Sequence, residues 1–290
     1  MVRCQEFAQS IELDPGGTAL APDVVVLVEV DEPWPKPVAK HESMIALVQA
    51  AQARPEQIRL LAAVPQGDDP RRVIAFRPTK GGALRSERVL CADPVGALHE
   101  VLDDETPEQL RCRDGVTTML ICTQGSHDIC CGIEGLAFAE WAEEELDLEV
   151  FRVSHTGGHR FAPTAMTLPD GRMWAYLNPE TTTEVLQTRT DAAAVAGRCR
   201  GWWGTPTGPA QVAERAVFAT LGFVVDEQDR SVEVAEHDGR YDVTVHVGDT
   251  THKVVVELGR EVPTIACGAL GGQPVKPGRE WRVRSGPTAQ

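Results

Sequence analysis

Short runs of apolar residues alternate with polar segments over the first hundred residues. Residues 23–30, DVVVLVEV, are rich in β-branched side chains and predict a buried strand, and residues 40–53 place apolar side chains at helical spacing. Residues 93–104 predict a second helix, with Asp93 as its N-cap and Pro94 in its first position. Three further segments resemble strands between these helices: residues 57–64, 71–78 and 86–92. The predicted order is therefore strand, helix, three strands and helix.

The same order of elements recurs in the next part of the chain. A strand, a helix, a strand, a hairpin and a helix are predicted over residues 115–123, 135–146, 148–154, 160–177 and 182–197. The hairpin contains Asp170-Gly171, a pair that is typical of a tight turn. Each half thus has the element order of a thioredoxin-like core, although the two halves share little residue identity. We therefore predict an α/β fold with two thioredoxin-like halves.

A third part follows the repeat. Residues 198–209, RCRGWWGTPTGP, are dense in glycine and proline and predict a linker. A helix over residues 210–222 and alternating strands predict a small α+β domain with an antiparallel meander; the strands cover residues 230–239, 240–248 and 251–259. The predicted domains are a degenerate thioredoxin-like domain without metal ligands, a thioredoxin-like domain with the candidate site, and the α+β domain, over residues 1–112, 113–204 and 205–290.

Composition and charge narrow the possible partners and locations. The 290 residues carry a formal net charge of −15, which argues against nucleic acid or an anionic membrane as a partner. The longest apolar run is too short to span a bilayer, and the N-terminal segment lacks the apolar core of a signal peptide. We expect a cytoplasmic protein, in which the eight cysteines are free thiols or metal ligands rather than disulfides.

Two motifs in the second half carry the candidate chemistry. Residues 122–131, CTQGSHDICC, follow one predicted strand, and the motif HTGGH, residues 155–159, follows another. Loops at the ends of such strands meet at one edge of an open α/β sheet. The glycines between the two histidines permit a sharp turn, so both imidazoles can face one ion, and the loop from Cys122 to Cys131 is long enough to bring both sulfurs there.

The donor types restrict the metal. Thiolate and imidazole suit zinc, iron–sulfur iron or copper and hardly suit calcium or magnesium. Eight residues, TQGSHDIC, separate Cys122 from Cys131, whereas zinc fingers space their cysteines by two to four residues. The spacing therefore weakens the zinc interpretation without excluding it.

The segments ICTQGSHDICCG and SHTGGHRFAPTAMTLPDG together resemble the sucrase/ferredoxin-like family. The resemblance implies a thioredoxin-like ferredoxin with one [2Fe-2S] cluster, and the family motif, carried onto this chain, gives the ligands Cys122, Cys131, His155 and His159. Cys131 is favoured over Cys130 because Gly132 follows it, and His127 is a less favoured alternative ligand or proton donor. The resemblance implies an electron carrier or redox sensor, not shown to be an enzyme, whose redox partner is an unknown reductase or electron acceptor.

Two alternative functions use the same residues. In the first, the four ligands hold a structural zinc ion and the protein acts as a binding module. In the second, Cys130 or Cys131 is the attacking thiol of a thiol oxidoreductase and Cys122 resolves the mixed disulfide, although the usual CxxC motif is missing.

The remaining polar residues are expected to have supporting or structural roles. Thr123 and Ser126 are candidates to donate hydrogen bonds to sulfur, and Arg152 and Arg160 either offset cluster charge or are solvated. The isolated cysteines are expected to pack as small apolar residues, except that Cys4 is placed in a mobile end: Cys91, Cys112, Cys199 and Cys267. Structural roles are also expected for the three strand histidines: His237, His246 and His252. The N-terminal half is expected to be structural or a docking surface.

Overall fold

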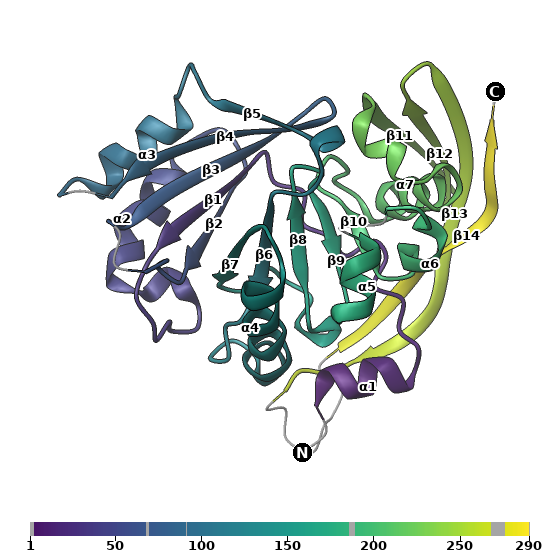
Figure 1. The fold of residues 1–290 in the computed structure, drawn as a ribbon. Coiled ribbons are helices and arrows are strands. Elements are labelled where there is room, and N and C mark those ends of the chain that lie inside the picture. The colour runs from purple at the N-terminus through teal and green to yellow at the C-terminus, as the bar shows by residue number, and fades with distance from the viewer. Residues whose placement is uncertain (1–2, 68–69, 91, 186–188, 268–275, 290) are drawn as a thin grey trace.

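The computed structural model describes residues 3–67, 70–90, 92–185, 189–267 and 276–289. Within these residues, ten strands form one mixed sheet in the order β10-β9-β8-β6-β7-β2-β1-β3-β4-β5 (Figure 1). Their bounds are β1 (Val24–Glu29), β2 (Ile58–Ala63), β3 (Arg72–Thr79), β4 (Gly82–Val89), β5 (Glu108–Arg111), β6 (Thr118–Cys122), β7 (Glu149–Val153), β8 (Ala165–Leu168), β9 (Arg172–Trp174) and β10 (Cys199–Trp202). The predicted mixed α/β class is confirmed.

The two halves of the chain repeat one pattern of strand pairing. In the first half β1 is parallel to β2 and antiparallel to β3, which pairs with β4. In the second half β6 is parallel to β7 and antiparallel to β8, which pairs with β9. The halves join where β2 and β7 meet antiparallel at Ala63 and Val153, so the carboxyl ends of both parallel pairs converge. This convergence places the loops after these strands beside one another.

Alternation along the strands explains how the sheet is covered. In β1, Val24, Val26 and Val28 face a core shared with α2 (Glu42–Gln52) and α3 (Pro94–Leu102). The intervening Val25 and Leu27 belong to a second core that also contains side chains of β6, β7 and β8. This second core joins the two halves, and a third one packs the far face of the second half on α4 (Leu136–Glu145).

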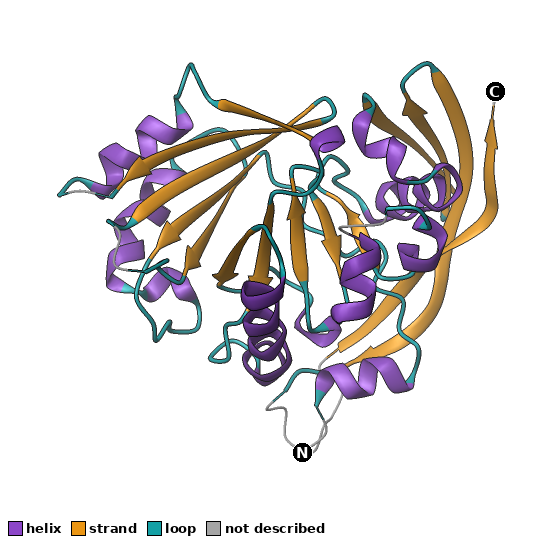
Figure 2. Cartoon of the chain, in the orientation of Figure 1, coloured by secondary structure: helices purple, strands orange, loops and turns teal. Residues whose placement is uncertain are grey.

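A separate antiparallel sheet occupies the C-terminal part. Among the described residues it has the order β11-β12-β13-β14, with bounds Arg230–His237, Arg240–Val247, Thr250–Thr264 and Lys276–Ala289. Helix α7 (Gly208–Leu221) packs its valines on this sheet and also contacts β10, so it lies between the two sheets (Figure 2). The predicted helix and three-stranded meander are confirmed, whereas β14 was not predicted.

Two predictions about local structure are wrong. The supposed linker contains β10, and its Trp202 and Trp203 lie in the core between the halves, because burial of two indoles outweighs the glycine and proline content. The single helix over 182–197 is replaced by α5 (Pro179–Thr183) and α6 (Ala192–Ala196), because Asp191 caps a new helix by accepting from the Ala194 N–H. Residues 186–188 lie outside the described residues.

The polar lead-in to the first strand is also more ordered than expected. Residues Cys4–Ser10 form α1, which lies beside the lower ends of β13 and β14 in Figure 1, far from them in sequence. Ala8 and Leu13 pack with Phe161 and Val262, so this segment joins a small core of its own. The N-terminal and C-terminal parts of the chain therefore meet beside the second half of the large sheet.

The predicted turn at Asp170-Gly171 is confirmed and gives a stability test. Gly171 has φ +68°, and a Cβ on it would lie 2.1 Å from Nε1 of Trp203. Gly239 has a similar φ of +76° with nothing within 4 Å, so it isolates the backbone cost. We expect Gly239→Ala to lower the free energy of unfolding by about 1 kcal/mol. Gly171→Ala should lower the free energy of unfolding by about 1–3 kcal/mol more than Gly239→Ala, because its methyl group also overpacks against Trp203. Chemical denaturation measures both free energies. Equal costs would contradict the predicted clash.

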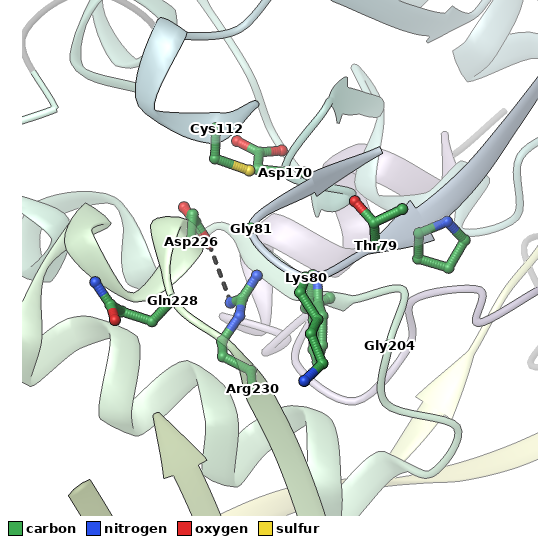
Figure 3. Close-up of a pocket in the computed structure, with 12 residues that line it drawn as sticks. Thr79, Lys80, Gly81, Cys112, Asp170, Gly204, Asp226, Gln228 and Arg230 are labelled. Atoms are coloured by element: carbon green, nitrogen blue, oxygen red, sulfur yellow. Dashed lines mark ion pairs between the residues drawn. The ribbon is translucent and has the colours of Figure 1, made fainter. Parts of the chain in front are cut away.

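Buried ion pairs connect the C-terminal part to the large sheet. Arg172 of β9 pairs with Glu214 of α7 and with Asp226, and Arg230 of β11 also pairs with Asp226. A cavity of about 270 Å³ opens beside this network, bordered by the turn between β3 and β4 (Figure 3). Cys112 is another of its lining residues, and none of the candidate ligands lines it.

Candidate metal centres

The first group of candidate ligands lies at the carboxyl end of the parallel pair β6 and β7. Cys122 is the last residue of β6, Cys131 begins the helical turn before α4, and His155 follows β7. One ligand atom from each of these residues lies within 4.8 Å of the others, and both sulfurs are buried. The prediction that the two motifs meet at one sheet edge is therefore confirmed for these three residues.

The glycines of HTGGH make the required turn. Gly157 and Gly158 have φ values of +82° and +75°, which residues with a Cβ rarely adopt. A Cβ on Gly158 would also lie 2.7 Å from the guanidinium carbon of Arg200. Arg200 donates to the carbonyl of Gly157 at 3.1 Å, so the turn and this arginine fit closely together.

A hydrogen bond joins the two thiols of this group. A hydrogen bond from Cys131 holds the pKa of Cys122 well below its usual value, and the same bond raises the pKa of Cys131. Cys122 is thus poised to be a thiolate, the form that binds metals. Loss of the remaining proton of Cys131 requires a cation that replaces it.

A half-buried arginine and a buried one lie near this thiol pair, and the sequence alone did not reveal them. Arg59 of β2 and Arg200 of β10 interact electrostatically with Cys122, and burial lowers the pKa of Arg200 to about 10. Neither has a carboxylate partner among the residues that the structure describes; Arg59 donates to the carbonyl of His155. Their positive charge therefore remains available to an anionic group at this position.

Three histidine rings lie together at the outer side of the group. The rings of His127 and His155 are stacked with centroids 3.5 Å apart, and the rings of His155 and His159 are 5.9 Å apart. Burial, together with the neighbouring positive groups, lowers the pKa of His127 to about 4. His127 is therefore neutral at neutral pH and covers one face of His155.

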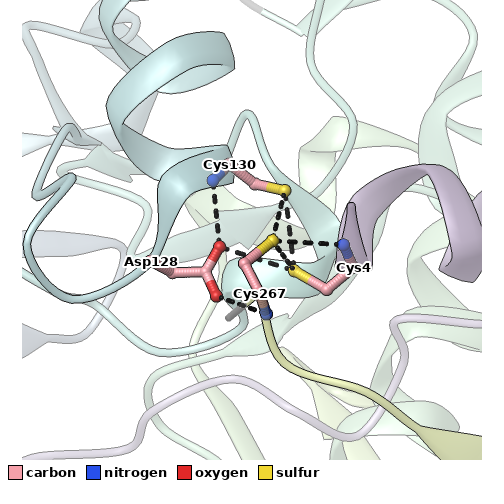
Figure 4. Close-up of side chains that lie close together, drawn as sticks. All are labelled: Cys4, Asp128, Cys130 and Cys267. Carbon is pink, nitrogen blue, oxygen red and sulfur yellow. Dashed lines mark hydrogen bonds between the residues drawn. The ribbon is translucent and has the colours of Figure 1, made fainter. Parts of the chain in front are cut away.

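His159 lies apart from the first group in the structure. Its Nδ1 is 2.9 Å from Oδ2 of Asp128 and 3.2 Å from Sγ of Cys4. Asp128 belongs to a second group of candidate ligands with Cys4, Cys130 and Cys267, whose ligand atoms lie within 4.8 Å of one another (Figure 4). The neighbouring Cys130 and Cys131 thus face different groups, which a linear motif cannot show.

Several predictions about isolated residues are wrong. Cys4 is fully buried at the start of α1 rather than in a mobile end, and Cys267 contacts other cysteines rather than apolar neighbours alone. Ser126 donates to the carbonyl of Trp34 at 2.6 Å and not to sulfur. Arg152 pairs with Glu143 at 2.7 Å in an exposed position, which agrees with the solvated alternative for this residue.

Other predicted residues are placed as follows. Cys112 and Cys199 are buried, as expected, and Cys91 lies outside the described residues. The hydroxyl of Thr123 has no partner among the described residues. The strand histidines that the structure brings into contact have only threonine or glutamate neighbours: His246 with Thr251 and Glu233, and His252 with Thr250.

The N-terminal half contacts the ligand loop directly. The side chain of Gln124 donates to the carbonyl of Pro35 at 2.9 Å and accepts from the backbone of His155 at 3.0 Å. Lys36 donates to the carbonyl of His127 at 2.7 Å. The loop after β1 therefore supports the loop that carries the cysteines, which is one structural role for the N-terminal half.

The fold and these groups define a mixed α/β protein with two cysteine-containing sites that are suited to metal ions. Over residues 15–201 the chain matches the sucrase/ferredoxin-like family, and it belongs to this family. No curated protein and no solved structure matches the chain. Among the described residues, no helix has both the length and the apolar composition needed to cross a membrane.

The first group also contains buried polar atoms without hydrogen-bond partners, which is consistent with a bound metal cofactor. Nδ1 of His155 and the hydroxyls of Thr123 and Thr156 are buried and have no hydrogen-bond partner among the described residues. A buried polar atom without a hydrogen-bond partner destabilises the folded protein, so such atoms are normally paired with a protein group or a bound ligand. Two thiols, an imidazole and nearby hydroxyls are a donor set that suits an iron–sulfur centre.

Proposed function

We propose that the protein binds one [2Fe-2S] cluster and transfers electrons. The ligands are Cys122, Cys131, His155 and His159. The observation that carries the proposal is the convergence of two buried thiols and one imidazole inside the segment that matches a family described as ferredoxin-like. Such a cluster accepts and donates single electrons, and the chain's own residues hold it and set its potential.

The contact between His159 and Asp128 supports His159 as the fourth ligand. When Nδ1–H donates to a carboxylate, Nε2 of the same ring keeps its lone pair for a metal. Two imidazoles on one tetrahedral ion, with bonds of about 2.1 Å, have centroids roughly 5 Å apart. The rings of His155 and His159 are separated by 5.9 Å, so a shift of about 1 Å would bring both onto one iron.

The repeated pairing pattern supports the finer fold assignment within this proposal. Each half contains a parallel pair followed by an antiparallel hairpin, as expected for a thioredoxin-like core. We propose that the second half is the cluster-binding one and that the first is its degenerate copy. A cytoplasmic location and a reductase or electron acceptor as partner complete the proposal, on the sequence arguments given above.

The first test is whether the purified protein carries the cluster. Protein purified without oxygen should be red-brown, with about two irons and two sulfides per chain. Cys122→Ser should lose most of both, whereas Cys112→Ser, which changes a buried thiol outside both groups, should keep them. Absorption spectra with iron and sulfide analysis provide the measurement. Colourless wild-type protein after attempted reconstitution would contradict the proposal.

The midpoint potential should depend on pH. The side chain of His159 is 19% exposed, so solvent reaches this imidazole. An imidazole held by oxidised iron through Nε2 would lose its Nδ1 proton more readily than one held by reduced iron, so reduction at high pH would be accompanied by uptake of that proton. The potential should therefore fall as pH rises, by up to about 59 mV per pH unit for one proton and one electron. Voltammetry between about pH 6 and 9 measures this slope, and a flat line would contradict imidazole ligation.

A further inference from the structure

A second group of metal-ligating side chains lies beside the first and is not needed to hold the proposed cluster. The sulfurs of Cys4, Cys130 and Cys267 form a triangle with edges of 3.6, 3.3 and 3.4 Å. Oδ1 of Asp128 lies 3.5 Å from the sulfur of Cys4 (Figure 4). We propose that these four residues bind a single zinc ion.

The separations agree with one tetrahedral ion. With Zn–S bonds of about 2.3 Å and a Zn–O bond of about 2.1 Å, two ligand sulfurs lie roughly 3.8 Å apart and oxygen lies roughly 3.6 Å from sulfur. The observed distances are shorter by about half an ångström or less, so small side-chain rotations admit the ion. Three thiolates on one iron of a [2Fe-2S] cluster do not fit, because bridging sulfides leave each iron two outer positions.

Backbone N–H groups hold two of the four ligand side chains in position. The backbone N–H of Cys4 donates to the sulfur of Cys267 at 3.2 Å, and those of Cys130 and Cys267 donate to the two oxygens of Asp128 at 2.9 and 3.2 Å. Such donors hold ligand atoms in place before the ion binds. Apolar neighbours close the site; they are Phe7, Ala162 and Ile265.

A positive side chain offsets part of the ligand charge. The guanidinium of the half-buried Arg160 interacts electrostatically with Cys4, and its buried Nε has no hydrogen-bond partner among the described residues. Three thiolates and a carboxylate carry more negative charge than one zinc ion neutralises. An adjacent arginine reduces that excess.

The places of the ligands along the chain indicate a structural role for the zinc ion. Cys4 begins α1, Cys130 lies in the ligand loop, and Cys267 follows β13. These residues are 126 and 137 positions apart in sequence, so the ion joins three distant segments at one point. Structural zinc sites stabilise folded chains in this manner. The zinc ion therefore fastens the N-terminal helix and the C-terminal strands to the loop that carries the cysteines.

Zinc analysis of the full-length protein tests this site separately from the iron site. We expect one zinc per chain by elemental analysis, and X-ray absorption at the zinc edge should show three sulfurs at about 2.3 Å and one oxygen or nitrogen. Cys4→Ser and Cys267→Ser should each lose most of the zinc. Cys112→Ser is the matched control and should keep it.

Three outcomes would overturn the proposal. The first is wild-type protein, purified without oxygen from zinc-containing medium, that holds less than about a tenth of a zinc per chain. The second is a disulfide between two of the three cysteines, which intact mass reveals as a loss of two hydrogens. The third is zinc with two sulfurs and two nitrogens that survives Cys4→Ser, because that result places zinc in the first group. X-ray absorption on the wild type answers the question even if a variant fails to fold.

Discussion

Replacing Arg172 with leucine is expected to lower the free energy of unfolding by about 3–5 kcal/mol, because it leaves two buried carboxylates without their main partner. The guanidinium is fully buried. It donates to Glu214 at 2.9 and 3.1 Å and to Asp226 at 2.9 Å. Both acidic side chains are fully buried as well. Arg230 and Arg189 remain as cations, yet they replace only part of the hydrogen bonds that Arg172 donates.

The position of Arg172 adds to the effect. It comes from β9, whereas its partners come from α7 and the turn that follows α7, so the ion pairs join the large sheet to the C-terminal part. The guanidinium also stacks over the ring of Phe218, with its carbon 3.8 Å from the ring centroid. The loss therefore affects packing as well as charge.

A matched control separates burial from charge. Arg240→Leu removes an arginine that is paired with Asp242 at 2.9 Å on the surface, where half of its side chain is exposed. Such exposed pairs contribute about 0–1 kcal/mol, so this variant should unfold close to the wild type. Chemical denaturation of the three proteins compares the midpoints. A cost below about 1 kcal/mol for Arg172→Leu would show that the buried network is not needed for stability.

The second large effect concerns the potential of the proposed cluster. Replacing His155 or His159 with cysteine should lower the midpoint potential by about 100–300 mV, since clusters with two histidine ligands lie several hundred millivolts above those with four cysteines. Each replacement exchanges a neutral imidazole for an anionic thiolate. The added negative charge disfavours the reduced state. Burial of the site strengthens this effect, because solvent screens the added charge weakly.

The arginines limit the size of the shift. Arg59 and Arg200 lie near Cys122 and keep their charge when a histidine is replaced. They should therefore hold the potential of the variants above that of a cluster without nearby cations. Arg200→Met, made in the wild-type protein, should lower the midpoint potential relative to the wild type. This variant also loses the hydrogen bonds of Arg200 with Thr18 and Gly157.

The control for the histidine variants is His246→Cys. His246 lies on β12 beside Thr251, outside both candidate metal groups, so the potential should not change. Voltammetry gives the midpoint, and the visible spectrum shows whether the cluster remains bound. If His159→Cys leaves both the spectrum and the pH slope unchanged, His159 is not a ligand, and its contacts with Asp128 and Cys4 assign it to the second group.

The amino-acid sequence by itself determined the local elements and indicated the residues of the first candidate group. The β-branched run of β1, the Asp93 cap of α3 and the turn at Asp170-Gly171 all follow from interactions between neighbouring residues, so they are readable along the chain. Cys122, Cys131 and His155 were predicted to meet because they lie in or beside the loops that follow two predicted strands, and such loops meet at one edge of the sheet.

Contacts between residues that are far apart in sequence determined the other features of the fold and of the candidate sites. Trp202 and Trp203 turned a supposed linker into part of the core, and β14 depends on pairing with β13. The cations Arg59 and Arg200 come from strands outside the two motifs. Cys4 and Cys267 are single cysteines 263 positions apart, and no local pattern indicates that they meet at Cys130. Such groups are created by folding of the whole chain, because only burial and strand pairing bring their members together.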